Sequence, residues 1–275
     1  MPDLTHPAYE TYRPVTPHAA VVLANNPDTM TLEGTNTWVL RAPGSSSAIV
    51  IDPGPADDER HLAAVLASVE RVEQILLTHG HSDHSGGARR FAELTGAPVR
   101  ALDPAHRYSG NGSITGLGDG DVVAAAGIEL RVWATPGHSS DSLCFLLDPQ
   151  GSDGAHDRLV LTGDTILGRG TTVVAYPDGT LGPYLASLQR LAELGDATVL
   201  PGHGPELPAA GAVATAYLAH REQRLNQVRA VVAQLGPEVE PRTVVEIVYA
   251  DVDPILWPAA ERSVQAQLAY LRDPL

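Results

Sequence analysis

Three histidines and one aspartate occupy six consecutive positions early in the chain, and this cluster constrains the fold more than any other feature. The segment His79-Gly80-His81-Ser82-Asp83-His84 follows the apolar run Ile75-Leu76-Leu77. Side chains alternate along an extended backbone, so the first two imidazoles lie on the same side. Imidazole and carboxylate groups bind Zn²⁺ and similar divalent ions. The cluster therefore predicts a metal site at the end of a buried strand, with room for a second ion at the following bend.

Three later polar residues stand in a similar context, each after a strand-like apolar run and beside glycine or a turn. His138 follows residues 132–137, Asp164 follows residues 159–163, and His203 follows residues 199–202. Strand ends can converge on one rim of a sheet, which is where ligands gather in α/β folds. With the first cluster these residues supply seven donors. That number is enough for two metal sites with open positions.

The charged residues and the single cysteine exclude several classes of function. All 18 basic residues are arginine, which excludes pyridoxal phosphate chemistry and P-loop nucleotide hydrolysis because both need a lysine. The net charge of −15 argues against broad, non-specific binding to polyanions. Cys144 can form no intramolecular disulfide, and its apolar context favours a core thiol over a nucleophile.

The chain shows no signal for export or membrane insertion. Its N-terminus lacks a basic segment followed by an apolar one, and no stretch approaches 18 uninterrupted apolar residues. We therefore expect neither a signal peptide nor a membrane helix, and we predict a cytoplasmic protein.

The order of expected elements predicts a layered α/β architecture followed by helices alone. Strands and helices alternate up to a last strand at residues 198–200, and Pro205 and Pro208 follow it. Apolar spacing then predicts helices over residues 209–235, 242–249 and 258–271. We therefore expect a catalytic domain over residues 1–208 and a small helical domain over residues 209–275.

Taken in order, the four motifs resemble those of the metallo-β-lactamase superfamily. They are His79-x-His81-x-Asp83-His84, Thr135-Pro136-Gly137-His138, Thr162-Gly163-Asp164 and Pro201-Gly202-His203-Gly204. The resemblance implies an αββα sandwich with the site on one edge. It implies two divalent ions, zinc being favoured by the histidine-rich set. One ion would be held by His79, His81 and His138, and the other by Asp83, His84 and His203. Asp164 would bridge the ions together with a hydroxide nucleophile, which Asp83 and Asp164 would orient.

Further motifs narrow the resemblance to one branch. Asp164 and His84 make the pattern similar to housekeeping hydrolases such as type-II glyoxalases and RNase Z-like nucleases. Residues 30–37, 163–172 and 220–224 resemble the endoribonuclease β-lactamase-like proteins, which implies a winged-helix-like C-terminal domain. The leading hypothesis is therefore hydrolysis of a phosphodiester, single-stranded RNA above all. A thioesterase or glyoxalase-II-like ester hydrolase is the alternative, and a non-catalytic metal-binding interaction protein is a third. Arginines converging on the cleft would favour RNA, and a narrow apolar tunnel would favour the ester.

Three residues are candidates for substrate contacts. Arg169, in a glycine-flanked loop, could reach a substrate anion, with a solvated loop arginine as the alternative. Asn36 could face the site or stabilise its strand, and His220 could line the cleft from its helix. From residue 215 onward six arginines stand against eight acidic residues, so no basic recognition face is expected. The expected partner is a small molecule or single-stranded RNA rather than double-stranded DNA. For the C-terminal helices we expect packing or a homodimer.

Overall fold

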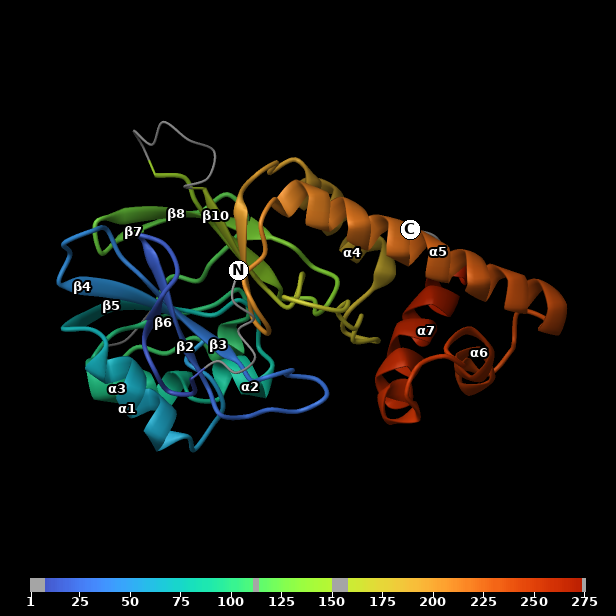
Figure 1. Ribbon diagram of the computed structural model, residues 1–275, viewed down its shortest axis with the longest axis horizontal. Coiled ribbons are helices and arrows are strands. Elements are labelled where there is room, and N and C mark those ends of the chain that lie inside the picture. The colour runs from blue at the N-terminus through green and yellow to red at the C-terminus, as the bar shows by residue number, and fades with distance from the viewer. Residues whose placement is uncertain (1–7, 111–113, 150–157, 274–275) are drawn as a thin grey trace.

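Two β-sheets lie face to face with helices on both outer sides, in a computed structural model that describes residues 8–110, 114–149 and 158–273 (Figure 1). The first sheet has the strand order β1-β2-β3-β4-β5-β6 and the second the order β11-β10-β9-β8-β7. The strands of the first sheet are β1 Arg13–Pro14, β2 Ala19–Leu23, β3 Asn36–Leu40, β4 Ser47–Ile51, β5 Arg71–Leu76 and β6 Val99–Arg100. Those of the second are β7 Val122–Ala125, β8 Ile128–Ala134, β9 Leu143–Leu147, β10 Leu159–Gly163 and β11 Thr198–Pro201.

Helices cover the outer faces and complete the four layers. They are α1 Glu59–Ala67, α2 Ser82–Ser85, α3 Ala88–Thr95, α4 Leu181–Ala192, α5 Ala210–Leu235, α6 Pro241–Val248 and α7 Trp257–Arg272, with short 3₁₀ turns η1 Pro104–His106 and η3 Pro254–Leu256. The αββα sandwich implied by the sequence is therefore confirmed. No helix in the three described ranges is both long enough and apolar enough to cross a membrane.

The layers follow from alternation along the strands. In β3, Trp38 and Leu40 enter the central core between the sheets, while Val39 between them faces the other way. That outer side of the first sheet packs against α1 and α3 through side chains such as Leu62 and Phe91. The outer side of the second sheet packs against α4 and the start of α5. Cys144 lies on this side and is fully buried, as its apolar context predicts.

Strand direction places the candidate residues at one edge of the sandwich. β5 runs parallel to β4 and β6, and β10 runs parallel to β11. The residues that follow β5, β10 and β11 therefore leave the sheets at their carboxyl ends. The two sheets meet there, because Asn36 donates its backbone amide to the carbonyl of Gly202 and the amide of Leu143 donates to Thr78.

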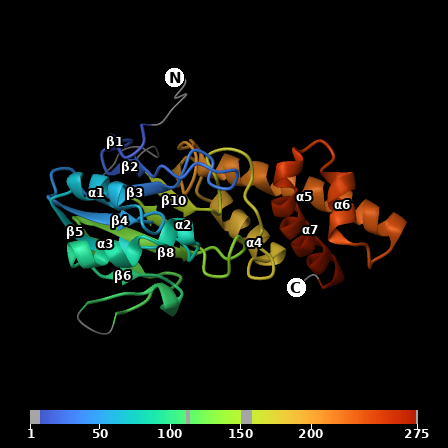
Figure 2. The same ribbon diagram turned by 90° about the horizontal axis from the view of Figure 1, so that it is seen from below.

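The C-terminal part consists of helices joined by short non-helical segments between residues 210 and 272 (Figure 2). Its long helix α5 belongs to two cores. The first half of α5 contributes Ala214 and Tyr217 to the core it shares with α4. Its second half packs through Val228 and Val231 against α6 and α7. Ala, Leu, Gln and Arg, which favour helix, fill much of this 26-residue element. Because α5 runs through both cores, a domain boundary at residue 208 stays a prediction.

Candidate metal centre

The first motif changes from strand to helix within a few residues, and this brings its side chains together. Strand β5 ends at Leu76, and His81 then has the extended backbone that precedes α2. One turn of α2 carries His84 back toward the strand end, so that its ring lies 4.3 Å from the ring of His79. His79 is 2 % exposed and His84 is fully buried.

Three imidazoles form what we call the three-histidine group, which consists of His79, His81 and His138. The Nε2 atoms of His79 and His138 each lie 3.0 Å from Nδ1 of His81. Ligand nitrogens at about 2.0–2.1 Å from one tetrahedral zinc are separated by roughly 3.3 Å. The three nitrogens therefore have the spacing of ligands around a single ion.

The carboxylate group lies beside it and consists of Asp83, His84 and His203. Nε2 of His84 lies 3.1 Å from Nε2 of His203. Oδ2 of Asp83 lies 3.3 Å from the first of these nitrogens and 3.1 Å from the second. Two imidazole nitrogens and one carboxylate oxygen at this spacing form a second set of ligands suited to a divalent ion.

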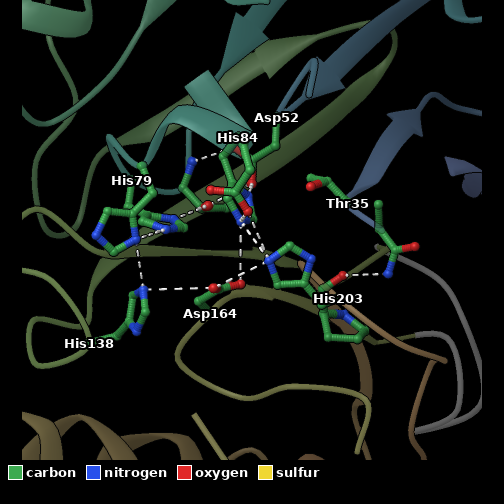
Figure 3. Close-up of polar contacts among 12 residues, drawn as sticks. Thr35, Asp52, His79, His84, His138, Asp164 and His203 are labelled. Atoms are coloured by element: carbon green, nitrogen blue, oxygen red, sulfur yellow. Dashed lines mark hydrogen bonds and ion pairs between the residues drawn. The ribbon is translucent and has the colours of Figure 1, made fainter. Parts of the chain in front are cut away.

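Asp164 lies between the two groups (Figure 3). Its Oδ2 is 3.4 Å from Nε2 of His203 and 3.7 Å from Nε2 of His138. Its Oδ1 is 3.4 Å from Nε2 of His84 and, although buried, accepts no hydrogen bond. A buried carboxylate oxygen without a donor is costly unless a cation satisfies it. The carboxylate of Asp164 is thus in a position to contact ions in both groups.

The histidines have their remaining ring nitrogens fixed by the protein. Nδ1 of His84 donates to Oδ2 of Asp52 at 2.9 Å, and Nδ1 of His203 donates to the carbonyl of Gly34 at 3.0 Å. Nδ1 of His138 donates to the carbonyl of Val173 at 2.7 Å. These bonds select the tautomer whose Nε2 lone pair faces the cluster, which is the usual arrangement around a metal-binding histidine. The residues present therefore fit divalent metal ions.

Asp52 is a residue of the site that the sequence reasoning missed. It follows β4, is 1 % exposed and has a backbone φ of 52°. Besides His84, it accepts hydrogen bonds from the backbone and the hydroxyl of Thr78, at 2.8 and 2.6 Å. The sequence did contain a signal, since Asp52 follows a buried strand and precedes Pro53-Gly54, the same context that identified Asp164.

The two groups differ in the direction of their pKa shifts. Burial lowers the pKa of His79 and His138, which face mainly other imidazoles. Burial opposes protonation of His203 as well, but the carboxylates of Asp164 and Asp83 outweigh it and raise its pKa to about 9. The same balance, with Asp164 and Asp52, raises the pKa of His84. A region that attracts protons in this way also attracts a divalent cation, which would displace them.

The predicted substrate contacts have specific partners. Asn36 is 5 % exposed and donates its side-chain amide to the carbonyls of Pro201 and Gly204, so it holds the loop that carries His203. This is the structural alternative considered for it. Arg169 forms an ion pair with Glu33. His220 is partly exposed, whereas its neighbour Arg221 is 3 % exposed and reaches the carbonyl of Thr172. Arg221 is a second residue that the sequence reasoning missed, because only the helix phase decides which neighbour faces inward.

The model of the metallo-beta-lactamase superfamily matches residues 30–203 of the chain. The chain belongs to this superfamily. The protein is therefore a metallo-β-lactamase-fold hydrolase whose histidine and aspartate groups are suited to binding divalent metal ions. The model of the beta-lactamase-associated winged helix domain matches residues 241–273, which confirms the predicted winged-helix-like C-terminal domain.

Similar proteins include two curated relatives and a solved structure. An atrochrysone carboxyl ACP thioesterase of Aspergillus fumigatus is 36 % identical over 195 residues, 69 % of this chain and 57 % of the thioesterase. A beta-lactamase-like protein 2 homolog of Caenorhabditis elegans is 32 % identical over 258 residues, 91 % of this chain and 82 % of that protein. The crystal structure of a beta-lactamase domain protein from Burkholderia ambifaria aligns with a TM-score of 0.76 and 22 % identity, covering 98 % of this chain and 90 % of that one.

Proposed function

We propose that this metallo-β-lactamase-fold hydrolase cleaves a small thioester or related ester at a centre of two zinc ions. One ion would be held by the three-histidine group and the other by the carboxylate group, with Asp164 contacting both. The observation that carries the metal proposal is the convergence of three sets of donors, each set within 4.8 Å, with Asp164 in the set that links the two groups. Histidine-rich sets of this kind favour zinc.

Each residue has a defined task in this proposal. Divalent ions held by the two groups would lower the pKa of a bound water and would polarise the carbonyl group of the substrate, whose carbon the water attacks. Asp83 and Asp164, whose pKa values are held low by neighbouring histidines although burial opposes this, stay ionised and accept hydrogen bonds from water. The buried histidine rings leave this water little freedom, so its attack would need no serine or cysteine of the protein. Cys144 is unsuited to attack, because burial raises the pKa of its thiol to about 11.

The charges beside the site favour an ester over RNA. Arg169 is ion-paired with Glu33, so its charge is neutralised before any substrate arrives. Asp28 and Asp253 line the hollow next to Arg169. Asp141 lies close to Gly80, which stands between His79 and His81 in the sequence. A polyanionic strand would meet repulsion from these carboxylates, whereas an uncharged acyl group would not.

The hollow beside Arg169 offers a place for an apolar part of the substrate. It has a volume of about 520 Å³ and lies between residues 27–32 and the η3 turn. Leu32, Ile255 and Leu256 contribute apolar surface to it. Leu32 also packs against Gly204, the neighbour of His203, so the hollow begins close to the carboxylate group. The apolar side chains of this concave surface suit the non-reacting part of a small substrate, while the charged residues lie beside them.

The similarity to a thioesterase supports the same choice. That relative is 36 % identical, but the chain spans only 57 % of its length, so its activity is transferred here as a proposal. Single-stranded RNA is the second candidate. It is favoured by the similarity to the endoribonuclease subgroup in residues 163–172, a loop that places Arg169 next to the site. A cytoplasmic location and a homodimer formed by the C-terminal helices also stay predictions.

The test starts from metal content. We expect close to two zinc ions per chain by elemental analysis after gentle purification. The zinc-loaded protein is then offered S-acyl-N-acetylcysteamine thioesters of increasing chain length, a single-stranded RNA oligonucleotide and a β-lactam. Thioester hydrolysis that improves with chain length supports the proposal. Intact thioesters together with cleaved RNA would replace it with the nuclease, and a protein that holds no transition metal after reconstitution would refute the metal centre itself.

A further inference from the structure

A short segment of chain, residues 172–175, lies between the three-histidine group and the C-terminal helices. On one side it contacts His138 three times. The carbonyl of Val173 accepts from Nδ1 of His138 at 2.7 Å, the hydroxyl of Thr172 lies 3.1 Å from the same nitrogen, and the amide of Ala175 donates to the carbonyl of His138 at 3.0 Å. The position of this histidine therefore depends on where the segment lies.

On its other side the same segment is held by two C-terminal helices. Nη2 of Arg221, from α5, donates to the carbonyl of Thr172. The hydroxyl of Ser263, from α7, accepts from the amide of Val174 at 3.3 Å. Thr172 and Val174 are both buried, at 3 % and 1 % exposure. The helices thus reach His138 through one intermediate layer of backbone.

The environment of Arg221 is unusual for a residue that serves stability alone. Its side chain is 3 % exposed, its Nε has no hydrogen-bond partner, and no carboxylate forms an ion pair with it in the part of the chain that the structure describes. Burying a cation without a counter-ion is unfavourable, and an apolar residue of similar volume often stabilises such a position. An ion pair therefore does not account for the guanidinium here, and its other contacts must do so.

The contacts of Arg221 lead instead to the metal centre. Its guanidinium lies 5.1 Å from the ring of Tyr184, whose hydroxyl donates to the carbonyl of Thr165 at 2.8 Å. Thr165 follows Asp164 directly, and Thr172 touches His138. One buried cation is thus connected to two of the predicted metal-binding residues, to His138 through Thr172 and to Asp164 through Tyr184 and Thr165.

We propose that Arg221 is a positioning residue through which the C-terminal helices fix His138, and with it the metal bound by the three-histidine group. This inference rests on the proposed role of His138 as a metal-binding residue. It gives the helical domain a function in assembling the centre, in addition to lining the hollow beside Arg169.

The chain provides a matched control for testing Arg221. Arg224, one turn further along α5, also donates to a backbone carbonyl, that of Val248 at 2.8 Å, and lies 4.6 Å from an aromatic ring, that of Tyr249. It makes these contacts to α6 and its C-terminal end rather than to residues 172–175. Arg221→Met and Arg224→Met therefore remove the same kind of interaction, but only the first is expected to reach the metal centre.

The experiment compares zinc affinity, measured by competition with a chromogenic chelator, and the visible spectrum of the cobalt-substituted protein. For Arg221→Met we expect affinity for one of the two ions to fall about 10- to 100-fold, with a changed cobalt spectrum. The melting temperatures of the metal-free variant and the metal-free wild type should be similar, which separates this loss from a loss of folding. Arg221→Lys should recover part of the affinity. Arg224→Met should bind zinc as wild type does.

The two methionine variants decide the inference, and Ser263→Ala replaces them where folding fails. Equal affinities and identical cobalt spectra for the two methionine variants would overturn it, while a metal-free wild type would overturn the proposed function first. Should Arg221→Met fail to fold, Ser263→Ala decides, because it loosens the same segment from α7 and leaves Arg221 in place. A smaller loss of affinity in that variant supports the inference, and an unchanged affinity refutes it.

Discussion

The two halves of the metal centre are built from similar side chains but have different electrostatics. The three-histidine group consists of imidazoles alone, and burial lowers the pKa of His79 and His138. In the carboxylate group Asp83 lies between two imidazoles, and acidic neighbours raise the pKa of His203 to about 9 although it is just as buried. Neutral ligands in the first half therefore depend on accurate positioning, whereas the second half also attracts a cation by its charge.

His61 shows what burial does without carboxylate contacts. It is fully buried behind the carboxylate group, where its Nε2 lies 2.7 Å from the hydroxyl of Thr37. Burial lowers its pKa to about 4, although the nearby charge of Asp58 opposes the shift. The difference between these two buried rings shows that the carboxylates in contact with His203 reverse the direction in which burial alone shifts the pKa.

The largest loss of activity is expected from a substitution of Asp164, which lies between the two groups. Asp164→Ala removes the carboxylate that contacts both groups and should lower kcat on the order of 1,000-fold or more, with circular dichroism unchanged. Asp178→Ala, which removes a nearby carboxylate bonded to Ser140, is the control. Near-normal turnover of the Asp164 variant would mean that the two halves act independently.

A smaller loss, of affinity for only one of the two ions, is expected from a substitution that acts on the carboxylate group alone. Asp52→Asn keeps the size of the side chain but removes the charge that fixes Nδ1 of His84. We expect the affinity for the ion of the carboxylate group to fall about 10- to 100-fold, while the three-histidine group keeps its ion. Zinc titration of the metal-free variant measures both affinities. If both fell equally, the separation into two groups would be wrong.

The smallest effect concerns His61 and pH. Its pKa is about 6.5 when unfolded and about 4 when folded, so the folded protein binds the proton less readily. The associated stability is present above pH 6.5 and is lost as the pH falls toward 4. Between pH 7 and pH 5 this loss amounts to about 2 kcal/mol.

His61→Gln, which can still donate to Thr37, should lack that loss. The measurement is the free energy of urea unfolding at the two pH values, with chelator present so that metal binding does not contribute. Equal pH dependence in wild type and variant would show that His61 stays accessible to protons.

The strands and helices could be predicted because their signals are local. The strand-like apolar runs of residues 159–163 and 199–202 indicate buried strands, and they match β10 and β11. Similarly, four of the candidate ligands lie within the six residues from His79 to His84, so the local sequence alone places them near one another. Asp52 had the same strand-end signal as Asp164 and was overlooked because it lies outside the motifs of the resemblance.

Only the tertiary structure decided which residues far apart in the sequence contact one another. Glu33 neutralises Arg169 across 136 positions of sequence, and the inward direction of Arg221 rather than His220 depends on how α5 packs against α4. The sequence by itself determined which residues could bind metal, because donor chemistry and strand periodicity act over a few residues. It could not determine which charges remain free or how each histidine is oriented, because Coulomb interactions and hydrogen bonds depend on distances that exist only after the two sheets and the C-terminal helices have packed together.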